Sequence, residues 1–229
     1  MYRLHIANKN YSSWSLRPWV LMKTLGIPFE EVQHDFPDDG PSYPQFVKFS
    51  PTGLVPVLED GPLSIWESLS IVEYLAERHP GVWPADPRAR AWARSAAAEM
   101  HGGFGVLRNR ATMNVGIRVD LHDKNDGLDG NVARMAALWA DGLKRFGGPF
   151  LAGKVFSAVD AFFCPVAFRA QSYGLLTDTT SAAYVQRLLD LPAMREWEAA
   201  ALKETAREPG HEADAKSTGT WTADFRAKV

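Results

Sequence analysis

Cysteine is nearly absent from this sequence, because Cys164 is the only one among 229 residues. A single cysteine cannot close a disulfide within the chain or build a cysteine-rich zinc site. The six histidines show no spacing typical of metal ligands, so we expect no metal. Both features favour a cytoplasmic protein. Cys164 lies among Phe162, Phe163 and Val166, a setting that predicts a buried core residue rather than a reactive thiol.

An excess of positive charge and long hydrophobic runs are also missing. Lys and Arg number 25 against 27 Asp and Glu, which gives a net charge of −2. Such a balance offers no basic surface for a nucleic-acid backbone or an anionic membrane. No stretch approaches the ~18 apolar residues that a membrane helix needs, and the N-terminus lacks the pattern of a signal peptide. We therefore expect neither nucleic acid nor a membrane as a partner.

The first 80 residues alternate between strand and helix patterns. Tyr2, Leu4 and Ile6 alternate with other residues as in a half-buried strand, and Asp60-Gly61 is a strong hairpin signal. We expect strands over 2–7, 29–36, 55–59 and 63–66, helices over 14–25, 45–49 and 68–78, and a loop over 38–44. This order is typical of a thioredoxin-like α/β domain, which we place at residues 1–80.

Only helical patterns follow the first domain. Residues 81–87 are rich in proline and predict a linker. Apolar stripes then predict helices over 92–109, 132–146, 158–172 and 184–204, so we expect an all-helical second domain over 88–205. Residues 206–229 are dominated by Gly, Ser, Thr and charge. We expect this segment to be a polar tail without a core of its own.

Two places in the first domain have the chemistry to bind a peptide-like ligand. Pro56 cannot donate a hydrogen bond to a central strand, so it is either a simple edge proline or the second residue of a cis bond that leaves the backbone of Val55 open to an extended peptide. Glu67 and Ser68 precede a helix, where they act as a cap or, with the helix amides, as an anion site. The sequence leaves both alternatives open.

A third place is the serine-rich turn Tyr11-Ser12-Ser13-Trp14-Ser15, before the first helix. Free amides and the helix dipole stabilise negative charge at such a turn. The absence of a Cys-X-X-Cys pair excludes thioredoxin-type redox chemistry, and no histidine and aspartate accompany the serines as in a hydrolase. We expect at least one serine to cap the helix, and a hydroxyl to donate a hydrogen bond to a bound anion.

Four segments together resemble the cytosolic glutathione S-transferases. They are YSSWSLR, SPTGLVPVLEDG, ESLSIVEYL and Ser157 to Asp160, which occur in the order and at about the separations usual in that family. The resemblance extends to about residue 204. The run SSWS followed by Arg17 is most similar to the serine-using classes, particularly the zeta-like group that includes maleylacetoacetate isomerase. The resemblance implies glutathione as co-substrate, a thioredoxin-like domain that binds it, and an all-helical domain that contributes a hydrophobic substrate site.

The resemblance also implies roles for individual residues. Counting back from Arg17, the catalytic serine falls on Ser12, with Ser13 and Ser15 as rivals. Val55 would pair with the cysteinyl backbone of glutathione, and Glu67 and Ser68 would hold its γ-glutamyl end. Structural roles fall to Pro56, Ser157 and Asp160. For the hydrophobic substrate site we select Tyr11, Trp14, Met100, Phe104 and Met113.

Two departures separate the chain from maleylacetoacetate isomerases. Trp14 stands where the zeta motif has cysteine, and Arg169 lies about one turn before the position of the substrate-binding arginine. We therefore expect a glutathione transferase that acts on a small electrophilic or hydrophobic molecule. A glutathione-dependent isomerase or dehalogenase and a non-catalytic binding protein of the same fold remain alternatives. The resemblance also implies a homodimer, and we expect His101 and His122 at the surface or an interface.

Overall fold

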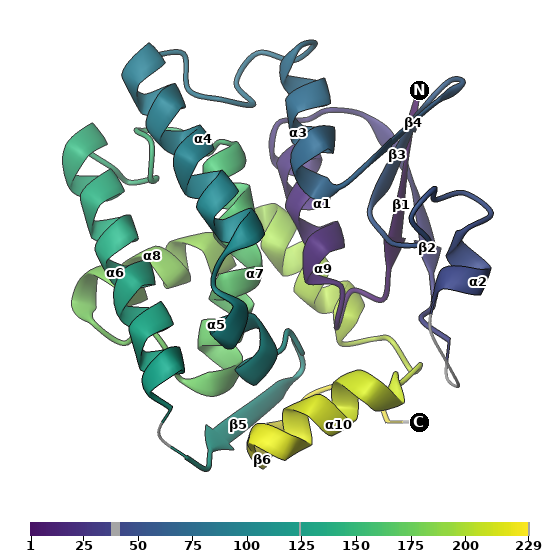
Figure 1. Cartoon of the computed structure of the whole chain (residues 1–229), viewed down its shortest axis with the longest axis vertical. Helices are drawn as coiled ribbons and strands as arrows, with labels where there is room; N and C mark the ends of the chain where they lie inside the picture. The colour runs from purple at the N-terminus through teal and green to yellow at the C-terminus, as the bar shows by residue number, and fades with distance from the viewer. Residues whose placement is uncertain (38–41, 124, 229) are drawn as a thin grey trace.

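The first part of the chain forms a four-stranded mixed sheet with helices against it (Figure 1). The computed structural model describes residues 1–37, 42–123 and 125–228. The sheet has the order β2-β1-β3-β4, in which β2 is parallel and β3 antiparallel to β1. Its elements are β1 (Tyr2–Ala7), α1 (Ser13–Thr24), β2 (Phe29–His34), α2 (Tyr43–Phe46), β3 (Val57–Asp60), β4 (Leu63–Trp66) and α3 (Ser68–Ala76). This is the expected thioredoxin-like order.

The local signals explain most of these boundaries. Leu4 and Ile6 are fully buried in β1, and Leu16, Trp19 and Val20 are fully buried in α1. Gly61 turns the β3–β4 hairpin with a φ of 58°, a backbone conformation that costs glycine little. The expectations of strand and helix at these places are confirmed.

The strands β2 and β3 and the helix α2 differ from the expected ranges. The β3 strand begins at Val57 rather than at residue 55, since Pro56 has no N–H for the ladder, and the Val55–Pro56 bond is cis. β2 ends at His34, before Phe36, and α2 covers Tyr43–Phe46 rather than 45–49. Of the loop expected over 38–44, residues 38–41 lie outside the described part of the chain.

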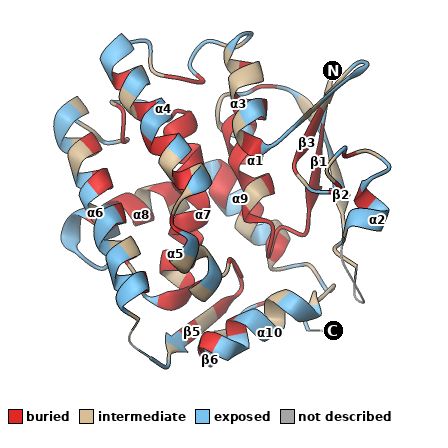
Figure 2. Cartoon of the chain, in the orientation of Figure 1, coloured by how far each residue is buried: buried red, intermediate tan, exposed pale blue. Residues whose placement is uncertain are grey.

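Helices dominate the second part of the chain. They are α4 (Pro87–Gly102), α5 (Gly105–Arg110), α6 (Asp126–Phe146), α7 (Ala158–Tyr173), α8 (Thr179–Leu189) and α9 (Pro192–Ala201). α7 is the central helix: it is buried along nearly its whole length and packs against α1, α4 and α8 (Figure 2). One hydrophobic core therefore runs from the sheet through α1 into the helical part.

The second part is mainly helical, as expected, but it also contains one strand pair that the sequence analysis did not predict. The strand β5 (Ile117–Leu121) pairs with β6 (Gly219–Asp224), which follows the helix α10 (Pro209–Thr218) in the supposed tail. The helix expected over 92–109 is broken at Phe104, which has a φ of 55°, and the helix expected over 184–204 is divided before Pro192. A proline disfavours helix in the residue before it, so this second break agrees with the sequence.

The start of α7 is fixed by Ser157 and Asp160, which form a capping box. Asp160 is fully buried, and its carboxylate accepts hydrogen bonds from the backbone N–H groups of Ser157 and Leu151, both at 3.0 Å, and from the hydroxyl of Tyr184 at 2.8 Å. One carboxylate thus ties α7, α8 and the loop before α7 together.

Across the described ranges, no helix is both long and apolar enough to cross a membrane.

Candidate active site

A cavity of about 660 Å³ lies between the two parts of the chain. Its walls come from the turn before α1, the segment before β3, the start of α3, the helices α4, α5 and α7, and α10. The lining residues are Tyr11, Ser12, Ser13, Trp14, Phe36, Ser42, Thr52, Leu54, Val55, Pro56, Glu67, His101, Arg108, Asn109, Thr112, Met113, Arg169, His211 and Asp214. Within the described residues, no group of three or more His, Cys, Asp or Glu side chains could hold a metal ion.

The three candidate serines have different places at the turn before α1. Ser12 and Ser13 line the cavity, whereas Ser15 is fully buried behind them and accepts a hydrogen bond from the N–H of Ala7. Ser12 occupies the N-cap position, but its hydroxyl donates to the hydroxyl of Ser15 at 2.7 Å instead of accepting from the helix amides. The expectation that a serine hydroxyl caps the helix is therefore wrong at the N-cap residue.

Val55 lies on the cavity wall beside this turn. Its N–H and carbonyl precede the first ladder pair of β3, and among the described residues neither makes a backbone hydrogen bond. This edge of the backbone is therefore open to an extended ligand.

Glu67 and Ser68 behave differently from each other. Glu67 lines the cavity and is the N-cap residue of α3, with a φ of 68° that is rare for any residue except glycine. Such a conformation costs about 1–3 kcal/mol and is common at binding sites. Ser68 is fully buried and does not line the cavity. Its hydroxyl accepts a long hydrogen bond of 3.5 Å from Arg17. Only the backbone N–H of Ser68 is thus in a position typical of anion binding.

Two arginines and a histidine surround the ring of Trp14. The guanidinium carbon of Arg17 lies 4.0 Å and that of Arg108 5.3 Å from the centre of the Trp14 ring, and His101 contacts it edge-on at 5.2 Å. Burial, together with the charges of Arg169 and Arg108, lowers the pKa of Arg17 to about 9. Burial and the charge of Arg17 also lower the pKa of His101, so this histidine is neutral at pH 7.

The hydrophobic wall is smaller than expected. Tyr11, Trp14 and Met113 line the cavity, but Met100 and Phe104 do not and belong to the buried core. Met100 and Phe104 are 1% and 7% exposed, and the helix α4, which carries Met100, packs against α7. The interpretation of both as substrate contacts is corrected accordingly. Cys164 is fully buried, as expected for a core residue.

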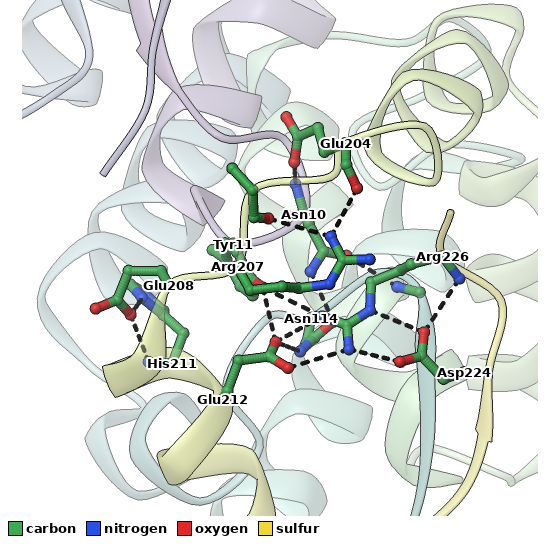
Figure 3. A network of polar contacts seen from close by, with 12 residues as sticks. Asn10, Tyr11, Asn114, Glu204, Arg207, Glu208, His211, Glu212, Asp224 and Arg226 are labelled. Carbon is green, nitrogen blue, oxygen red and sulfur yellow. Dashed lines mark hydrogen bonds and ion pairs between the residues drawn. The ribbon is translucent and has the colours of Figure 1, made fainter. Parts of the chain in front are cut away.

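Two residues of α10, His211 and Asp214, line the cavity, and the C-terminal segment forms a polar network with the turn before α1 (Figure 3). The phenol of Tyr11 donates to Glu212 at 2.7 Å, and Arg226 donates to Glu212, to Asp224 and to the oxygen of Tyr11. The side chain of Arg226 is 2% exposed. Burial and the bond to Glu212 raise the pKa of Tyr11, which keeps the phenol neutral at pH 7. His211 stacks on the Tyr11 ring, at 5.1 Å between ring centres.

Sequence reasoning missed several of the lining residues, namely His101, Arg108, Thr112, His211 and Asp214. His101 lies where α4 meets the first domain, 3.9 Å from the carboxylate of Glu67, so the expectation of an interface residue is confirmed for it. His122 is exposed, as expected. The positive charge of Arg108 and Arg110 was the sequence feature that could have pointed to α5 as part of the cavity wall. No local sequence feature links α10 to the cavity.

Comparison with known proteins agrees with this geometry. The family "Glutathione S-transferase, N-terminal domain" matches residues 11–78. Residues 11–78 are a glutathione S-transferase N-terminal domain. A zeta-class glutathione S-transferase from Euphorbia esula is 29% identical over 67% of this chain and 70% of its own length. The resemblance found in the sequence is confirmed.

Two further relatives extend the similarity over most of the chain. A probable maleylacetoacetate isomerase from Caenorhabditis elegans is 27% identical over 79% of this chain and 85% of its own length. The crystal structure of a Burkholderia glutathione transferase homolog, solved with bound glutathione, has a TM-score of 0.66 and 21% identity, and covers 87% of this chain and 97% of that one. Most of the chain therefore has the glutathione S-transferase fold.

Proposed function

We propose that this chain is a glutathione transferase that ionises the thiol of bound glutathione and joins its sulfur to a small electrophilic molecule. The observation that carries the proposal is that Ser12, the open backbone of Val55, and Glu67 all face one cavity. These are the residues at which the family resemblance expects the sulfur, the cysteinyl backbone and the γ-glutamyl end of the tripeptide. The strained backbone of Glu67 supports a binding role for the same position.

Glutathione would lie extended along the first domain. The N–H and carbonyl of Val55 would pair with its cysteinyl residue as an added strand. The carboxylate of Glu67 would bind the γ-glutamyl ammonium, and the first amides of α3, with that of Ser68, would bind the neighbouring carboxylate. The remaining volume of the cavity would then hold the second substrate against Tyr11, Trp14 and Met113.

The hydroxyl of Ser12 would lower the pKa of the glutathione thiol. A free thiol has a pKa near 8.5, and a decrease of about 2 units corresponds to about 2.7 kcal/mol. A hydroxyl hydrogen bond to a charged sulfur contributes roughly 1.5–3 kcal/mol, and the dipole of α1 adds up to about 1 kcal/mol. The thiol proton leaves to water. The thiolate then forms the sulfur–carbon bond, and the leaving group departs with the electron pair of the broken bond.

Isomerisation with glutathione is the second candidate, and one observation favours it. Arg169 lines the cavity although it lies about one turn before the expected position of a substrate-binding arginine. In an isomerase or dehalogenase, glutathione is released unchanged after the reaction, so mass spectrometry of the products separates these activities from conjugation. A non-catalytic binding protein would bind glutathione and give no product.

The proposal extends to the setting of the enzyme. The family resemblance supports a homodimer. The near absence of cysteine supports a location in the cytoplasm, where glutathione is kept reduced. Conjugation of small electrophiles would give the protein a role in detoxification.

Calorimetric titration with reduced glutathione tests the binding site. The Glu67→Ala variant is expected to bind glutathione at least tenfold more weakly, a change of about 1.4 kcal/mol, because the γ-glutamyl ammonium loses its carboxylate partner. Unchanged affinity would refute this placement, and a wild-type protein that does not bind glutathione would refute the proposed function.

Turnover with chlorodinitrobenzene as electrophile tests the role of Ser12. The Ser12→Ala variant is expected to lose ~10–100-fold in turnover with little change in glutathione affinity, since the hydrogen bond strengthens as the thiolate forms. Ser95→Ala is a matched control, because Ser95 is exposed on α4 and bonds only to the carbonyl of Ala91. Equal turnover in the two variants would refute the role of Ser12.

A further inference from the structure

Arg169 is a buried positive charge in the wall of the cavity. Its side chain comes from α7, is 5% exposed and lines the cavity beside the α1 turn. Burial lowers the pKa of Arg169 to about 10, so the guanidinium remains charged at neutral pH. No Asp or Glu of the described ranges forms an ion pair with it.

The partners of Arg169 are neutral oxygens. One terminal nitrogen donates to the carbonyl of Arg108 at 3.1 Å and to the carbonyl of Ala111, and the other donates to the hydroxyl oxygen of Ser13 at 3.3 Å. The third nitrogen, Nε, is buried without a partner among the described residues. A buried charge without an opposite charge costs several kcal/mol. An anion that arrives with a ligand would offset this cost.

The contact with Ser13 directs this charge toward the site of the sulfur. Because the oxygen of Ser13 accepts from Arg169, its hydrogen is free to donate into the cavity. A hydroxyl that accepts from a cation is polarised and becomes a stronger donor. Ser12, the other serine on the cavity wall, already donates to Ser15 at 2.7 Å. Ser13 is therefore the hydroxyl that can reach an anion without first breaking a hydrogen bond.

We propose that Arg169 is a positioning residue that acts through Ser13: the Ser13 hydroxyl donates to the glutathione sulfur beside Ser12, and the charge of Arg169 stabilises the sulfur in its anionic form. The inference rests on the proposed function and adds to it a second donor from the helical part of the chain. The thiol proton leaves to water. Since Arg169 lies on α7 and Ser13 on α1, activation depends on the contact between these two helices.

The other charged and titratable groups around the cavity are the same in the wild type and in variants at Ser13 or Arg169. They are Tyr11, Glu67, His101, Arg108, His211 and Asp214 on the cavity wall, and Arg17 behind Trp14. A difference in thiol pKa between the wild type and a variant at Ser13 or Arg169 is therefore due to that substitution, because the remaining charged groups are the same in both proteins.

The competing role for Arg169 is to bind a carboxylate of glutathione directly. In that case its replacement weakens glutathione binding and leaves the thiol pKa of the bound tripeptide unchanged. Two measurements separate the two roles: calorimetry gives the affinity, and the pH dependence of the ultraviolet absorbance of the bound thiolate gives the thiol pKa.

The test uses Ser13→Ala, Arg169→Gln and Arg169→Lys in the full chain. The first two are expected to raise the thiol pKa of bound glutathione by about 1 unit, which lowers the thiolate fraction about tenfold below that pKa, with affinity changed less than about twofold. Arg169→Lys keeps the charge and is expected to recover part of the shift. Arg187→Gln is the matched control, because Arg187 lies outside the cavity and also donates to a carbonyl, that of Pro149.

The results that overturn the inference are distinct from those that overturn the proposed function. If wild-type protein binds glutathione but Ser13→Ala leaves the thiol pKa unchanged, the inference is wrong and the proposed function stands. If Arg169→Gln loses affinity without a change in thiol pKa, the arginine binds a carboxylate and the inference is again wrong. If circular dichroism shows that Arg169→Gln does not fold, the thiol pKa values measured for Ser13→Ala and Arg169→Lys decide whether the inference holds. A wild-type protein that does not bind glutathione refutes both proposals.

Discussion

At the scale of single residues, Asp160 combines a structural role with an unusual protonation state. Its carboxylate is fully buried at the start of α7 and has donors as partners. Burial raises the pKa of Asp160 from 3.8 to about 6, although the hydrogen bonds from Leu151, Tyr184 and Ser157 oppose the shift. Folding thus makes this carboxyl bind its proton more tightly.

The raised pKa of Asp160 predicts a specific dependence of stability on pH. A group with a raised pKa in the folded protein contributes stability that is fully present below its unfolded value and is lost as the pH rises through its folded value. As the pH rises from about 4 to about 6, the titration of Asp160 is expected to lower the unfolding free energy of the protein by up to about 3 kcal/mol. Each pKa unit corresponds to about 1.4 kcal/mol.

Urea unfolding of the wild type and Asp160→Asn checks this expectation. Asparagine has the shape of the protonated acid and does not titrate, so the stability advantage of the wild type over the variant should decrease from pH 4.5 to pH 7. An advantage that grows with pH would mean that the carboxylate is more acidic in the folded protein than in the unfolded one, and would contradict the burial argument.

The candidate site could be predicted at some residues and not at others. Ser12 and Glu67 stand between a strand and the helix that follows it, and Val55 precedes a strand, so local signals place all three at one end of the sheet. Met100 and Phe104 could not be separated from true wall residues, because a helical stripe does not say which neighbour it faces. The contact between Arg169 and Ser13 joins residues 156 positions apart, and no local pattern encodes it.

At the scale of elements, the C-terminal segment is the main difference between expectation and structure. The strand pair β5–β6 joins residues about 100 positions apart with an irregular register near Val119, so neither strand has a partner close in sequence. Trp221 packs against the core from β6 and was one of the few apolar signals in the segment. The helices α1 and α3 of the first domain, by contrast, carry their apolar stripes within a few residues and were predictable.

The largely buried ion pair between Arg226 and Glu212 predicts how the C-terminal segment is held. Arg226→Gln removes the charge that pairs with Glu212 and with the more exposed Asp224, and breaking a buried pair by removing one partner costs about 3–5 kcal/mol. We expect amide hydrogen exchange in α10 to accelerate at least tenfold, whereas exchange in α1 and α7 stays unchanged, because the partners of Arg226 lie in this segment and at Tyr11, outside both helices.

Arg195→Gln is the control for this measurement. Arg195 also pairs with a carboxylate, that of Asp190, but both side chains are exposed, so the pair contributes about 1 kcal/mol at most. If exchange in α10 is equally slow in both variants, the ion pairs of Arg226 do not hold the C-terminal segment in place.

At the scale of the whole molecule, five exposed apolar side chains lie close together in the sequence. The described residues from 43 to 66 contain Tyr43, Val47, Leu54, Leu63 and Trp66, all large, apolar and exposed. The strand β4, which carries two of them, is an edge strand of the sheet. Clusters of exposed apolar side chains are typical of protein interfaces. This surface is therefore the one we assign to the proposed homodimer.

Substitution of Trp66 tests that assignment. Trp66 is 43% exposed on β4, and in a homodimer with two-fold symmetry one substitution changes the interface twice. Trp66→Glu would bury two unpaired carboxylates, so we expect a dimer mass for the wild type and a monomer mass for the variant in light scattering at micromolar concentration. Phe225→Glu is the matched control, because Phe225 is 58% exposed after β6, outside this surface, and should leave the dimer intact. A wild-type monomer would refute the homodimer. A dimer that survives Trp66→Glu and dissociates with Phe225→Glu would instead place the interface at the C-terminal segment, next to the polar network of that segment.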